Sequence, residues 1–282
     1  MQLVVVAVDG SAASLAAVKW GAVEASKRGA TLRVASSYEP PRYLYAGSLV
    51  PPENFFEDLH DEAEKIAAEA AESVKDIVAA EVTVVESNPV DMLLEMSKEA
   101  TMIVMGTRGR GEFKGAMLGS VSAAVVSHAD CPVVVIRDDA SFVPDGPIVV
   151  GVDGSEVSDR AVEHAFEEAK ERGVELLAVH TWADVQFPVS EEHWRDIEQE
   201  ERDLLLSRLE APLAKYPEVT VETLISRERP ATALSQAAAD AQLLIVGSHG
   251  RGGFRGMLLG STSRALLQDA PCPMMVVRPK KK

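Results

Sequence analysis

Two glycine-rich loops in this sequence have the composition of an anion-binding site. Each loop follows a short apolar run, Ile103–Met105 in the first case and Leu244–Val246 in the second, and each leads to a Gly-Ser pair where a helix is predicted to begin. Glycine lets the backbone approach a ligand, backbone N–H groups point at it, and the dipole of the following helix favours negative charge. The sequence therefore predicts two sites for an anionic group such as a phosphate.

The two loops share the spacing G-x2-G-x9-G-[ST]. The residues of this pattern are Gly106, Gly109, Gly119 and Ser120, and then Gly247, Gly250, Gly260 and Ser261. The second glycine of each set is expected to need either a positive φ or a close approach to the phosphate, and a Cβ atom would prevent both. The loops lack the G-x4-G-K-[ST] sequence of a P-loop and the third glycine of a dinucleotide-binding turn. Basic residues outnumber acidic ones in both loops, with Arg108, Arg110 and Lys114 against Glu112, and with Arg251 and Arg255.

An aspartate followed by glycine and serine ends the first predicted strand of each half, at Asp9 and Asp153. In doubly wound sheets, ligands bind beyond the carboxyl ends of the strands where the strand order reverses. If the first and fourth strands are neighbours, each aspartate faces the glycine loop of its half across one crevice, where it would hydrogen-bond a ribose hydroxyl or an adenine edge. The alternative is that the aspartates only shape the turn before an N-capping serine. Recurrence in both halves favours ligand contact.

Alternating strands and helices are predicted to position these loops. Leu3–Val8 is a nearly continuous β-branched run, typical of a strand buried on both faces. Ser11 is expected to cap the following helix and Gly29 to end it. Leu15 is predicted to face inward from that helix, and Phe56 and Ile77 from the next.

The same order of elements restarts after a polar linker, so each half reads β-α-β-α-β-α-β-α-β. A chain of 282 residues suits two domains, which we place at 1–137 and 148–282, with a linker at 138–147. The predicted fold class is α/β: two tandem doubly wound domains that arose by duplication, each a five-stranded parallel sheet with helices on both faces.

Composition excludes several functional classes. The net charge of −16 argues against a general nucleic-acid surface. Cys131 and Cys272 occupy equivalent places beside a proline, which predicts buried, reduced thiols and no metal site. The N-terminus lacks a basic segment of the signal-peptide type, and no apolar run approaches the ~18 residues of a membrane span. We expect a cytoplasmic protein with no membrane or nucleic-acid partner.

With these motifs in view, the chain resembles the universal stress protein family in its tandem form. The resemblance rests on Val-Asp-Gly-Ser after the first strand of each half, on the repeated glycine pattern and on Cys-Pro before each fifth strand. In the ATP-binding branch of that family, the glycine pattern marks the nucleotide site. The resemblance implies a Rossmann-like fold of the adenine nucleotide alpha hydrolase type and ATP as the ligand, with Mg²⁺ or Mn²⁺ as the open choices of metal. It also implies pairing of the domains about a pseudo-twofold axis, with Val133–Ile136 and Met274–Val277 at the contact, and homodimerisation.

The resemblance further implies which residues contact the nucleotide. They are Asp9, Gly106, Arg108, Gly109, Gly119, Ser120, Val121 and Ser122, and then Asp153, Gly247, His249, Gly250, Arg251, Gly260, Ser261, Thr262 and Ser263. The aspartates would contact adenosine, the loop glycines would admit the phosphates, and the serines would donate hydroxyls and amides to them. The ends of the second strands, near Ser36 and His180, would meet adenine through the backbone.

The two halves differ at Arg108 versus His249 and at Glu112 versus Gly253. Glu112 would repel a triphosphate, so the second site is expected to be the stronger. His249 lies inside its loop and is a functional candidate, whereas His180 is better interpreted as a strand-end or core histidine.

The predicted function is that of an ATP-binding regulator of a stress response, with at most weak ATPase activity. Ser120 and Ser261 lack an evident base and are therefore interpreted as caps and phosphate ligands, with no catalytic residue predicted. A slow ATP hydrolase or nucleotidyl transferase, and a structural protein that binds no nucleotide, remain as alternatives.

Overall fold

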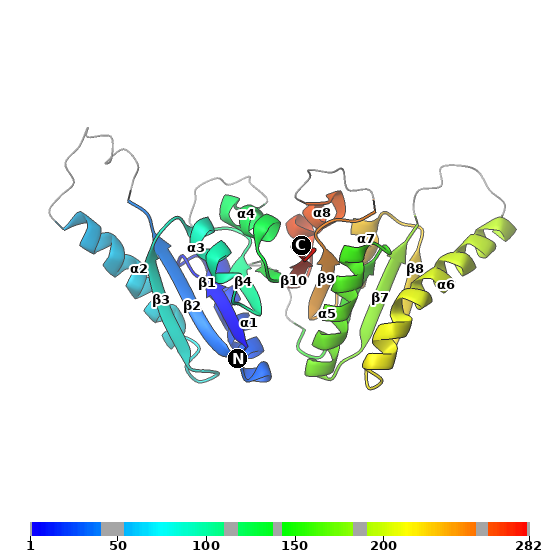
Figure 1. The fold of residues 1–282 in the computed structure, drawn as a ribbon, viewed down its shortest axis with the longest axis horizontal. Coiled ribbons are helices and arrows are strands. Elements are labelled where there is room, and N and C mark those ends of the chain that lie inside the picture. Colours follow the sequence, from blue (N-terminus) through cyan, green and yellow to red (C-terminus); the bar gives the residue numbers. More distant parts are fainter. Residues whose placement is uncertain are drawn as a thin grey trace. The chain divides into compact units, whose positions relative to one another are not determined.

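The chain folds into two compact units, Met1–Asp138 and Asp139–Lys282 (Figure 1). The computed structural model describes residues 2–40, 54–109, 118–137, 143–182, 191–251 and 259–280, and only the backbone of 191–194. Five of the loop residues named above, Arg110, Glu112, Lys114, Gly253 and Arg255, and part of the predicted linker lie outside these ranges.

The first unit contains a parallel sheet with the strand order β3-β2-β1-β4-β5. Its strands are β1 (Leu3–Ala7), β2 (Thr31–Tyr38), β3 (Ala80–Glu86), β4 (Met102–Gly106) and β5 (Val133–Ile136). Its helices are α1 (Ala12–Arg28), α2 (Phe55–Glu72), α3 (Pro89–Met96) and α4 (Ser120–His128). Helices α1 and α2 cover one face of the sheet, while α3 and α4 pack together on the other.

The second unit repeats this arrangement with the strand order β10-β9-β6-β7-β8. Its strands are β6 (Ile148–Val152), β7 (Leu176–Thr181), β8 (Val221–Ser226), β9 (Leu243–Gly247) and β10 (Met274–Val277). Its helices are α5 (Glu156–Arg172), α6 (Glu191–Lys215), α7 (Pro230–Ala237) and α8 (Ser261–Asp269). The predicted fold class, two tandem doubly wound α/β domains, is confirmed.

Local sequence accounts for the limits of the first helix in each unit. The Ser11 side chain accepts a hydrogen bond from the Ser14 backbone N–H at 3.2 Å, and Ser155 accepts one from Ser158 in the same way. Gly29 ends α1 with a φ of 57°, a left-handed conformation that costs glycine little. Both predicted ends of α1 are therefore confirmed.

The predicted inward faces of the helices were partly wrong. Leu15 on α1 is 41% exposed, and Phe56 at the start of α2 is 43% exposed. Helix α2 ends at Glu72, before Ile77, which is also exposed. The buried residues of α2 are the alanines Ala63, Ala67 and Ala70, of which Ala63 and Ala70 belong to the face that the sequence predicts to point inward.

None of the helices in the described ranges combines the length and apolar character that a membrane crossing requires.

Candidate functional site

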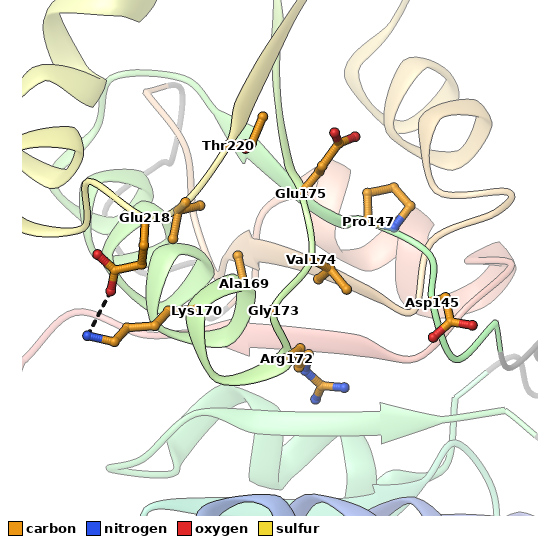
Figure 2. A pocket seen from close by; sticks show the side chains of 11 residues that line it. Asp145, Pro147, Ala169, Lys170, Arg172, Gly173, Val174, Glu175, Glu218 and Thr220 are labelled. Carbon is orange, nitrogen blue, oxygen red and sulfur yellow. Dashed lines mark ion pairs between the residues drawn. The ribbon is translucent and has the colours of Figure 1, made fainter.

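One cavity of the second unit lies at the amino edge of its sheet and contains none of the predicted site residues. It has a volume of about 590 Å³, and its lining includes Pro147 and Val174 (Figure 2). Lys170 and Glu218 form an ion pair of 2.8 Å beside it. The glycine loops lie at the opposite, carboxyl edge of their sheets.

Strand neighbours bring each aspartate to the glycine loop of its half. β1 pairs with β4, and β6 pairs with β9, so the condition set by the sequence is met in both units. β1 also pairs with β2 on its other side, which makes the gap between β1 and β4 the point where the strand order reverses. This is the edge at which doubly wound sheets bind ligands.

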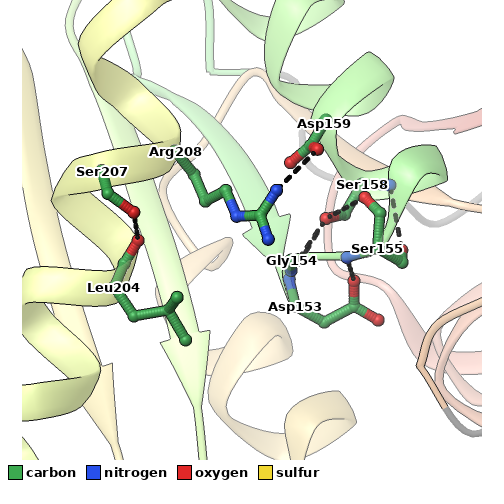
Figure 3. Close-up of polar contacts among 8 residues, drawn as sticks. All are labelled: Asp153, Gly154, Ser155, Ser158, Asp159, Leu204, Ser207 and Arg208. Atoms are coloured by element: carbon green, nitrogen blue, oxygen red, sulfur yellow. Dashed lines mark hydrogen bonds and ion pairs between the residues drawn. The ribbon is translucent and has the colours of Figure 1, made fainter.

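Each aspartate holds the turn that follows its strand. Asp153 Oδ1 accepts a hydrogen bond from the Ser155 backbone N–H at 2.9 Å (Figure 3). Asp9 Oδ1 accepts the equivalent bond from Ser11 at 3.0 Å, and a second from the Ser11 hydroxyl at 2.7 Å. In Figure 3 the Ser158 hydroxyl lies at the same turn, where it accepts from the Gly154 N–H at 3.1 Å. The turn-shaping role weighed from the sequence is therefore present, whatever else the carboxylates do.

The first two glycines of the pattern are explained by contacts within the protein. A Cβ on Gly106 would lie 2.7 Å from the Ala13 Cβ, so this glycine lets β4 pack against the first turn of α1. A Cβ on Gly109 would lie 2.3 Å from Asp9 Oδ2, and one on Gly250 would lie 2.3 Å from Asp153 Oδ2. The second glycine of each loop is thus required by a carboxylate of the same half.

Backbone conformation does not explain these loop glycines. The positive φ values in the described residues belong to Gly10, Gly29, Gly154 and Gly173. Gly109 and Gly250 therefore have no positive φ, and of the two reasons that the sequence offered for glycine, close approach is the one that applies. The approaching group is a carboxylate of the protein.

The third glycine precedes a helix that has no capping side chain. Gly119 takes an extended conformation before α4, and Gly260 does the same before α8. Neither helix has an acidic residue in its first turn. The first N–H groups of a helix have no partner within it, so these two termini can donate to an anion.

The serines of these helices divide into two roles. Ser120 and Ser261 are exposed first residues of α4 and α8. The Ser122 hydroxyl is buried and donates to the Gly106 carbonyl at 2.9 Å, and the Ser263 hydroxyl donates to Gly247 at 2.7 Å. These buried hydroxyls fasten the helix start to the strand end. Their hydrogens point into the protein and not toward a ligand.

A cavity of about 680 Å³ opens at this edge of the first unit. All eight residues predicted in the first half line it, namely Asp9, Gly106, Arg108, Gly109, Gly119, Ser120, Val121 and Ser122. Its lining also includes Ala35 and Ser37 from β2 and Met92 and Leu93 from α3. The methionine and leucine were not predicted, because an apolar residue on a short helix looks like any core residue.

The loop of the second unit differs from the first in its side chains. His249 stands where the first loop has Arg108, and its Nδ1 lies 2.9 Å from the Ser248 hydroxyl. The Arg251 backbone N–H donates to Asp153 Oδ2 at 3.0 Å. The Arg251 guanidinium lies against Gly154, where a Cβ would meet it at 2.5 Å. The predicted residues of the second half thus gather at one edge, as those of the first half do.

His180 on β7 is held by contacts inside the protein. It is buried, with Nδ1 2.6 Å from the Val152 carbonyl and Nε2 2.7 Å from Glu201 on α6. The interpretation of His180 as a strand-end core histidine is confirmed.

One group of possible metal ligands lies away from the glycine loops. The donor atoms of His60, Asp61 and Glu64, all exposed on α2, lie within 4.8 Å of one another. Spacing along the sequence did not single them out, and exposed groups of this kind are common without an ion.

Comparison with known proteins places the chain in a family. The sequence model of the universal stress protein family matches residues 1–137 and 146–278. Two universal stress proteins of Mycobacterium tuberculosis are 41% and 39% identical to this chain, with 98% of this chain and 96% and 94% of those proteins covered.

A solved structure shows the same fold over the whole chain. A universal stress protein from Archaeoglobus fulgidus has a TM-score of 0.71 at 23% identity, with 98% of each chain covered. The two family matches within one sequence, together with the full-length relatives, identify the tandem form. The chain belongs to the universal stress protein family.

Proposed function

We propose that this chain binds an adenine nucleotide, ATP, at the carboxyl edge of the sheet in each unit. In this proposal the bound nucleotide regulates a stress response by changing the conformation of the chain or its binding of partners. The proposed sites consist of the seventeen residues named from the sequence, eight in the first unit and nine in the second.

The observation that carries the proposal is the two-part chemistry of the cavity in the first unit. The cavity is lined by the uncapped N-terminus of α4 at Gly119 and Ser120 and by Arg108. It is also lined by the apolar residues Ala35, Met92 and Leu93. A nucleotide has the same two parts, a charged phosphate chain and a flat base. The volume of about 680 Å³ lies within the range of small-molecule sites.

The second unit supports the same proposal through its matching geometry. Asp153 meets Gly250 as Asp9 meets Gly109, and α8 begins after Gly260 without a capping side chain. His249 stands in place of Arg108 beside the helix start, so the affinities of the two sites are expected to differ.

Calorimetric titration of the full chain with ATP tests the proposal. Two equivalents per chain are expected, and mass spectrometry of the denatured protein should detect co-purified adenine nucleotide. The double variant Gly109→Ala/Gly250→Ala is the matched control and should bind none. Absence of binding at millimolar ATP, together with absence of co-purified nucleotide, would refute the proposal.

A further inference from the structure

The aspartate that ends β1, and its counterpart at the end of β6, each join two segments that are distant in sequence. One oxygen of each carboxylate is used within its own turn: Asp9 Oδ1 binds Ser11, and Asp153 Oδ1 binds Ser155. This oxygen keeps the carboxylate in a fixed orientation at the strand end.

The other oxygen faces the glycine loop. Asp153 Oδ2 accepts the Arg251 backbone N–H at 3.0 Å, across 98 positions in the sequence. The same oxygen would lie 2.3 Å from a Cβ on Gly250, and Asp9 Oδ2 has the same relation to Gly109. In the first unit the Ser11 hydroxyl, whose hydrogen is donated to Asp9 Oδ1 at 2.7 Å, lies 3.3 Å from the Arg108 carbonyl, so the turn and the loop are adjacent there too. The contact between carboxylate and loop therefore recurs in both units.

The geometry assigns Asp9 and Asp153 the role of positioning residues, which fasten the glycine loop to the turn after the first strand and so set the shape of the phosphate-binding backbone. The contact between carboxylate and loop is given by the distances above. Its effect on phosphate binding rests on the proposed function. This role is additional to the adenosine contact that the family resemblance implied.

Aspartate suits this role by its length and by its two acceptor oxygens. Glutamate is one methylene longer and would push against the glycine that approaches Oδ2. Asparagine keeps the shape but has a donor N–H₂ group in place of one oxygen, so its single acceptor oxygen cannot replace both of the oxygens that bind Ser155 and Arg251. Both substitutions should therefore release the loop while leaving the hydrophobic core unchanged.

The test compares ATP with inorganic triphosphate as ligands of the full chain. The double variant Asp9→Asn/Asp153→Asn changes both sites alike, so the titration does not have to resolve the affinities of the two sites. If the carboxylates position the loop, affinity should fall for both ligands, and for inorganic triphosphate on the order of tenfold or more. If the carboxylates only contact adenosine, affinity for ATP falls while affinity for inorganic triphosphate stays at the parent value, and this outcome overturns the inference. Asp9→Glu/Asp153→Glu keeps the charge and should fail to restore binding; restoration would also overturn it.

A second measurement is independent of any ligand. Amide hydrogen exchange of residues 247–251 in the parent and in Asp153→Asn reports whether the carboxylate holds the loop. Exchange at Arg251 should become at least several-fold faster in the variant, and unchanged exchange would overturn the inference. A parent that binds neither ligand would refute the proposed function, while this exchange result would still decide the fastening role. Should the asparagine variant fail to fold, Gly250→Ala disturbs the same contact from the loop side and takes its place.

Discussion

Gly106 at the end of β4 lies against Ala13 of α1 so closely that a Cβ on the glycine would sit 2.7 Å from the Ala13 Cβ and 2.9 Å from its carbonyl carbon. The atoms met by such a Cβ include backbone, which cannot move aside as a flexible side chain can. The first glycine of the pattern is therefore a packing residue between strand and helix, whatever its relation to a ligand.

We expect Gly106→Ala to lower the free energy of unfolding by about 1–3 kcal/mol, the usual cost of overpacking. Gly247→Ala should cost less, because its nearest neighbour is a methyl group of Val157 at 3.0 Å. Denaturant unfolding of the two variants gives the comparison. Equal costs would show that the two units do not differ at this contact.

Gly109→Ala and Gly250→Ala should each remove one nucleotide site while leaving the fold intact. The added Cβ meets only the end of the Asp9 or Asp153 side chain, which can rotate away at the expense of its contact with the loop. Calorimetry should show one equivalent of ATP in each single variant. Gly173→Ala is the control, because it strains a left-handed position at the other end of α5 by roughly 1 kcal/mol and should leave two equivalents. Two equivalents in both loop variants would show that the loops are not the phosphate sites.

Cys131 and Cys272 should react slowly with thiol reagents in the native protein. Both are buried and unpaired, and burial raises the pKa of each thiol from 9.0 to about 12. The thiolate is the reactive form, so it stays scarce at pH 8. Because the folded pKa is raised, the protonated thiols favour the folded state below about pH 9, and this stabilisation is lost as the pH rises toward 12. Labelling with a chromogenic disulfide at pH 8 should find two thiols only after denaturation.

Glu168→Gln should destabilise the second unit by about 3–5 kcal/mol, the typical cost of breaking a buried ion pair. The Glu168 and Arg172 side chains are 3% and 2% exposed and lie 3.1 Å apart, and Arg172 also donates to Gln242 at 2.8 Å. Glu24 and Arg28 form the equivalent pair in the first unit. Chemical denaturation should show a clear loss for Glu168→Gln and almost none for Glu218→Gln, which removes an exposed pair. Similar midpoints for the two variants would contradict the prediction.

The full chain should show no salt-sensitive binding to duplex DNA. Its net charge is −16, and phosphate backbones are bound by basic surfaces that release counterions. An electrophoretic mobility assay at about 100 mM salt should leave the duplex unshifted. A shift that weakens as salt is raised would contradict this expectation.

Much of the fold was predictable because its signals are local. The apolar run of β1, the Ser11 cap and the Gly29 stop each depend on a few consecutive residues, and each is found where expected. The helix faces were less predictable. Leu15 has a helical spacing that suits the core, yet it remains exposed because its direction depends on where α1 crosses the sheet.

The candidate site, like the fold, was predictable only in part. The repeated glycine pattern and its two halves were determined by the sequence alone, since spacing and residue type carry that information, and the prediction of an anionic ligand rests on the same pattern. Only the tertiary structure decided what each glycine meets: Asp9 and Gly109 are 100 positions apart in the sequence and approach one another because β1 pairs with β4. Likewise, His180 finds the Val152 carbonyl on one neighbouring element and Glu201 on another. Such contacts depend on strand order and helix placement, which no single stretch of residues encodes.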